Sequence, residues 1–117
     1  MILRPTIYKR FNHRRQRKIC IRDRLQDHSG RPFWYQKAQT LARIHENVYM
    51  EISGLPPQNL LNYFPELERI AHKVIYGSDW PAVPTIKENI IALQNLSISE
   101  EAKRMILGEN AARLLKL

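Results

Sequence analysis

The sequence has 117 residues, the usual size of one domain or of a piece of a larger one, so two complete domains are excluded. Hydrophobic residues make up 44% of it, which is enough for a core and excludes disorder throughout the chain. The net charge of +8 is uneven, because residues 1–27 hold nine Lys and Arg against two Asp, whereas residues 28–117 hold ten Lys and Arg against nine acidic residues.

The basic segment 1–27 predicts an irregular, poorly ordered arm, because closely spaced like charges repel one another and resist packing. Tyr8 and Phe11 lie among these charges, so a small nucleic-acid-binding protein that uses the arm is an alternative, although no recognised binding motif is present. The single cysteine, Cys20, excludes an internal disulfide framework. The lack of long apolar runs and of a signal-peptide pattern predicts a cytoplasmic chain outside the membrane.

The segment 28–54 predicts a first unit of helix and strand, which opens at His28-Ser29-Gly30. Apolar and aromatic residues then recur on one face of a helix, at Trp34, Ala38, Leu41, Ala42 and His45. Val48–Ile52 predicts a short strand, and a Ser-Gly pair turns the chain after it.

Two further units follow the same rhythm. Apolar residues at helical spacing follow Pro56-Pro57, and Pro65 divides them into two short helices. The segment Lys73–Gly77 is apolar on both sides, as in buried parallel strands. The alternation of helical and strand patterns predicts an α/β fold with a parallel sheet.

The C-terminal third predicts three helices with recognisable ends. Thr85 and Glu88 form a capping-box pattern at the start of the first helix, and Ser99 is suited to the N-cap of the second. Gly108 is a candidate to end the second helix in a left-handed conformation, and Asn110 is a candidate to cap the last one.

Three polar residues fall where parallel strands end, which is where such sheets gather functional side chains. Asp79 follows Val74-Ile75-Tyr76 through a Gly-Ser turn, His28 precedes Gly30 at the first junction, and Glu51 lies near the end of Val48–Ile52. A carboxylate and an imidazole suit a divalent metal and the water that it activates. The alternatives are a turn or capping role for Asp79, a loop histidine at position 28 and a solvent-facing Glu51.

Four segments stand in an order that resembles the C-terminal part of the amidohydrolase-related family. They are His28-Ser-Gly-Arg-Pro-Phe-Trp, Asn47-Val-Tyr-Met-Glu-Ile-Ser-Gly54, Lys73-Val-Ile-Tyr-Gly-Ser-Asp-Trp-Pro81 and Ile106-Leu-Gly-Glu-Asn-Ala-Ala-Arg-Leu-Leu115. Members of the family are metal-dependent hydrolases and decarboxylases on a (β/α)8 TIM barrel. The resemblance covers residues 28–117 and implies a partial barrel of about three C-terminal βα units behind the basic arm.

The resemblance also implies roles for individual residues. His28 is similar to the histidine that ends the sixth barrel strand and orients or deprotonates the hydrolytic water. Asp79 is similar to the aspartate that ends the eighth strand, a metal ligand and proton acceptor. The implied cofactor is a divalent metal, usually zinc, and the implied substrate is a small amide, ester or lactone. Decarboxylation of a small substrate is the second reaction that the family suggests.

This sequence departs from the family pattern in its first half. No His-x-His pair occurs, and the only histidine before His28 is His13, within the basic run. The residues before His28 are polar, whereas an apolar strand is expected there, and a complete barrel takes about 200–400 residues. We therefore expect a truncated family member that binds metal weakly or not at all, lacks hydrolase activity alone, and exposes a sheet edge through which it could self-associate.

Overall fold

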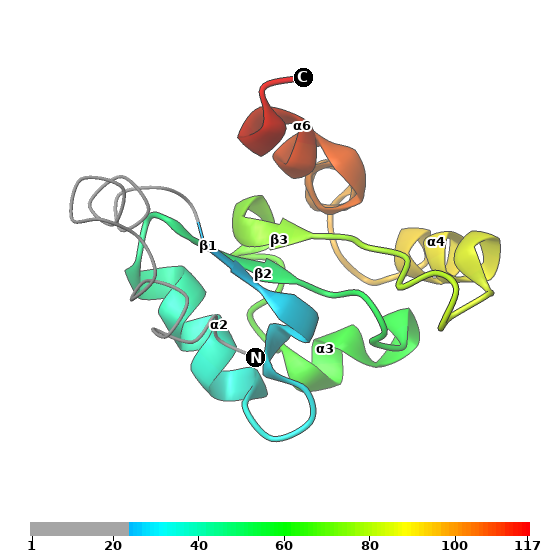
Figure 1. Cartoon of the computed structure of the whole chain (residues 1–117), viewed down its shortest axis with the longest axis horizontal. Helices are drawn as coiled ribbons and strands as arrows, with labels where there is room; N and C mark the ends of the chain where they lie inside the picture. Colours follow the sequence, from blue (N-terminus) through cyan, green and yellow to red (C-terminus); the bar gives the residue numbers. More distant parts are fainter. Residues whose placement is uncertain (1–23) are drawn as a thin grey trace.

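The computed structural model describes residues 24–117, and the predictions made for the basic arm before Arg24 lie outside them. Its centre is a parallel sheet in the order β1-β2-β3, formed by Arg24–Gln26, Val48–Glu51 and Val74–Ile75 (Figure 1). Gln26 pairs with Met50, and Met50 pairs with Val74. The predicted α/β class with parallel strands is confirmed, while the partial TIM barrel and self-association through the sheet edge stay predictions.

Residues 24–27 were predicted to belong to the arm, but the structure places them in the sheet and the turn that follows. Arg24–Gln26 is strand β1, and Asp27–Gly30 is a short 3-10 segment. The polar sequence concealed this strand because main-chain groups make the ladder, whatever the side chains are. Gln26 is buried at the position next to Met50, while Leu25 is partly exposed.

Helices pack on both sides of the sheet. In Figure 1, α2 (Tyr35–Ile44) and α3 (Leu60–Tyr63) lie below the strands, and α6 (Asn110–Leu115) lies above them. The remaining elements are the 3-10 segments Pro57–Asn59 and Ala71–Lys73, α4 (Ile86–Gln94), α5 (Glu100–Arg104) and a π-helical turn, Met105–Glu109. Within residues 24–117, no helix has the length and apolar character that a membrane crossing requires.

The core is one cluster of buried side chains that joins the sheet to the helices and connecting segments around it. Met50 and Val74 are fully buried and belong to one cluster with the side chains of several helices and connecting segments: Ala42, Leu60, Phe64, Leu67, Ile70, Leu93, Leu96, Ala102 and Ile106. The predicted helical face of α2 is confirmed at Ala38 and Ala42, whereas Trp34 precedes the helix and is 57% exposed. Burial of this cluster is the main force that holds the sheet in place.

The predicted helix ends are confirmed in one case and wrong in three. The Ser99 hydroxyl accepts a hydrogen bond from the Ala102 amide (3.1 Å), as an N-cap does, but Thr85 makes no such bond. Gly108 does not end a helix, because the π-helical turn carries the chain directly into α6. Asn110 is no cap either, since its amide Nδ2 is buried and donates to the carbonyls of Ala71 and Val74, each at 2.7 Å.

Candidate functional site

The carboxyl ends of the three strands bring three short segments to one edge of the sheet, because the strands are parallel. Strand β1 runs directly into Asp27 and His28, and β2 ends at Glu51 just before Ser53-Gly54. Strand β3 leads through Gly77 to Asp79. The edge therefore holds all three residues that the sequence singles out.

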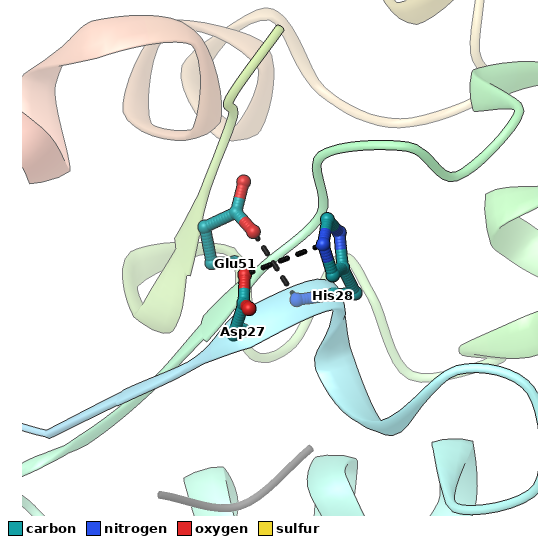
Figure 2. A group of neighbouring side chains, drawn as sticks. All are labelled: Asp27, His28 and Glu51. Carbon is teal, nitrogen blue, oxygen red and sulfur yellow. Dashed lines mark hydrogen bonds and ion pairs between the residues drawn. The ribbon is translucent and has the colours of Figure 1, made fainter. Parts of the chain in front are cut away.

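His28 is held in a left-handed backbone conformation, with φ at 49°, which is uncommon outside glycine. Its ring Nδ1 lies 2.8 Å from the carbonyl oxygen of Ser53 and 3.1 Å from the Ser53 hydroxyl. A carbonyl can only accept, so the hydrogen-bond pattern assigns the proton to Nδ1. The other ring nitrogen, Nε2, lies 3.6 Å from Asp27 Oδ1 (Figure 2).

The Glu51 carboxylate is buried at this edge of the sheet and binds its neighbours through hydrogen bonds. It is 8% exposed, so the alternative of a solvent-facing Glu51 is wrong. One oxygen accepts from the Ser53 amide (2.7 Å), and the other accepts from the Ser53 hydroxyl (2.7 Å) and the His28 amide (3.2 Å). The carboxylate also lies against Gly77, where a side chain would collide with Oε1. Glu51 thus contacts the ends of all three strands. It binds the His28 amide directly and is linked to the His28 ring through the Ser53 hydroxyl.

Asp79 and His28 both lie beside Gly54. The position that an alanine Cβ would take at residue 54 lies 2.7 Å from Asp79 Oδ2 and 3.4 Å from His28 Nδ1. Asp79 has a left-handed backbone with φ at 57°, and its carbonyl accepts from the Val83 amide (2.9 Å). Among residues 24–117, its carboxylate has neither a hydrogen bond nor an ion pair, so this side chain does not brace the turn.

Arg31 is the residue at this edge that sequence reasoning missed. Its Nη1 donates to the Gly54 carbonyl (2.8 Å) and lies 3.3 Å from the same alanine Cβ position. The residue occurs in the His28-Ser-Gly-Arg segment, but nothing in that spacing says that the guanidinium reaches the turn after β2. Arg31 and His28 from one segment and Asp79 from another therefore lie around the same glycine.

The donor atoms at this edge are of the types that bind divalent cations. Within the part of the chain that the structure describes, Asp27, His28 and Glu51 each offer a ligand atom within 4.8 Å of the others (Figure 2). Carboxylate oxygen and imidazole nitrogen are ligands that such metals accept. The oxygens of Glu51 already accept three hydrogen bonds, whereas the Asp79 carboxylate has no partner within residues 24–117. Asp79 therefore fits the metal better than Glu51 does.

Comparison with known proteins agrees with the resemblance seen in the sequence. A family model described as Amidohydrolase matches residues 25–117, which include β1 to β3 and every residue of the candidate site. Searches of curated proteins and of solved structures found no match.

Proposed function

Because the chain belongs to the amidohydrolase family, we propose that residues 25–117 supply part of the active site of a metal-dependent hydrolase. The reaction would be hydrolysis of a small amide, ester or lactone. The observation that carries this proposal is the meeting of the Asp79 carboxylate and the His28 imidazole beside Gly54.

Asp79 would hold the divalent metal, for which zinc is the first choice. When bound, the metal supplies an activated water, since it lowers the pKa of that water to about 7. Asp79 suits the task because its charge has no competing partner within residues 24–117. Catalytic zinc takes about three protein ligands, and the others would come from further strands of the same barrel, so this chain alone would lack hydrolase activity.

His28 would move the proton. Its Nδ1–H is fixed by the Ser53 carbonyl, so Nε2 is the atom that can accept a proton and return it to a leaving group. Glu51 would act as a positioning residue, because its hydrogen bonds hold Ser53 and the His28 amide in place.

Decarboxylation is the second candidate reaction. The guanidinium of Arg31 at the same edge favours it, since a substrate carboxylate would pair with that charge. The same Asp79 and His28 would serve either reaction.

Metal binding at Asp79 tests the proposal in the chain as it exists. Mn²⁺ added to the 15N-labelled protein should broaden the amide signals of Gly54, Ser78 and Asp79 through its unpaired electrons. Asp79→Asn removes the charge but keeps the shape, and should weaken this effect by at least about tenfold.

Asp27→Asn is the matched control, because Asp27 offers the same group on the same edge, 3.6 Å from His28 Nε2. It should leave the broadening near Gly54 unchanged. Loss of the effect in Asp27→Asn, together with an unchanged effect in Asp79→Asn, would reject Asp79 as the metal ligand.

A further inference from the structure

The guanidinium of Arg31 lies at the candidate site with most of its donors unused. It donates one hydrogen bond, to the Gly54 carbonyl (2.8 Å), whereas a guanidinium has five N–H donors. Within residues 24–117 it forms no ion pair, although Asp79 Oδ2 lies beside the same glycine. Arg31 is exposed, so a ligand can reach it.

We propose that Arg31 binds a carboxylate group of the substrate, which makes the substrate class a small carboxylic acid. The inference rests on the proposed function, since it places the reacting part of that acid next to Asp79 and His28. A planar guanidinium receives a carboxylate through two parallel hydrogen bonds, and its charge does not depend on pH in the working range.

The surroundings of Arg31 favour a singly charged carboxylate over a phosphate. Three carboxylates, those of Asp27, Glu51 and Asp79, gather at this edge. A phosphate with nearly two negative charges would be repelled by them more strongly, and Arg31 is one cation only. A carboxylate matches both the charge and the flat shape of a single guanidinium.

Two neighbours keep the guanidinium available. Gly54 has φ at +69°, and any side chain there would approach Arg31 Nη1 to 3.3 Å and Asp79 Oδ2 to 2.7 Å. Burial and the neighbouring Tyr63 raise the pKa of Tyr35, against the opposing charge of Arg31. The Tyr35 phenol therefore stays neutral and does not compete for Arg31. Its ring is stacked on Tyr63, with 4.6 Å between the ring centroids.

Benzoate and its neutral analogue benzamide are the probes for this inference. Titration of the 15N-labelled chain with benzoate should shift the amide signals of Arg31 and Gly54, while benzamide should shift them at least about tenfold less effectively. Arg31→Gln should weaken benzoate binding by about tenfold or more. Arg104→Gln is the matched control, because it removes the same charge from an exposed site elsewhere, and it should bind benzoate like the wild type.

Three results would overturn the assignment. They are equal binding of benzoate and benzamide, unchanged benzoate binding in Arg31→Gln, and tighter Arg31-dependent binding of inorganic phosphate than of benzoate. Mn²⁺ broadening near Asp79 is recorded on the same samples. If the broadening persists while benzoate does not bind, the carboxylate inference is wrong and the metal proposal stands. If benzoate binds at Arg31 while Mn²⁺ causes no broadening near Asp79, the metal proposal alone is rejected.

Discussion

Gly77→Ala should lower the free energy of unfolding by about 2–4 kcal/mol. The added methyl group would collide with Oε1 of Glu51 and approach Ser53 Cβ to 3.0 Å. The buried carboxylate cannot move away without breaking its hydrogen bonds to Ser53 and His28. Chemical denaturation followed by circular dichroism measures the change.

Gly108→Ala is the matched control for this substitution. Gly108 is exposed in a helical segment, and an added Cβ would meet no heavy atom within 4 Å. Alanine is better than glycine in a helix by about 0.5–1 kcal/mol, so this variant should be slightly more stable than the wild type. A Gly77→Ala variant as stable as Gly108→Ala would show that the Glu51 carboxylate does not pack against Gly77.

Asn110→Ala should destabilise the chain by about 2–4 kcal/mol, because it strips two buried carbonyls of their donor. Asn110 is fully buried, and its Nδ2 lies 2.7 Å from both the Ala71 and the Val74 carbonyl oxygens. These bonds join the start of α6 to the first residue of the 3-10 segment Ala71–Lys73 and to the first residue of β3. Loss of the amide should therefore detach the C-terminal helix first.

Hydrogen exchange by residue separates this effect from a general loss of stability. Amides of α6 and of Val74 should exchange faster in Asn110→Ala. Asn95→Ala is the control, since Asn95 is an exposed residue after α4 and makes no side-chain bond within the described residues. Equal protection of α6 in the two variants would contradict the role given to Asn110.

The sequence predicted most of the helices and two of the strands because their apolar residues recur with the period of the element. The second short helix expected after Pro65 is wrong, since the chain forms turns over residues 65–70. Ala38 and Ala42 on α2, and the strand around Met50, follow this rule. Strand β1 could not be found in this way, because its ladder is made by main-chain groups and its side chains are largely polar. Gly108 and Asn110 predicted a helix end that does not occur. The local sequence favours an end there, but packing of this segment against β3 keeps the chain helical.

The candidate site was predictable where it depends on topology. The rule that parallel strands present their carboxyl ends at one edge places Asp79 and His28 on the same side of the sheet, as the structure does. The bracing role of Glu51 and the reach of Arg31 to Gly54 depend on left-handed backbone conformations at His28, Ser29 and Asp79. Such conformations are rare outside glycine, and the spacing of residues does not reveal them.

Anomalous X-ray scattering from a crystal of this chain grown with Zn²⁺ shows whether Asp79 is a metal ligand, because it locates the metal without reference to activity. We expect a peak about 2.0–2.2 Å from a carboxylate oxygen of Asp79, beside Gly54. A peak confined to Asp27, His28 Nε2 and Glu51, with Asp79 out of reach, would contradict it.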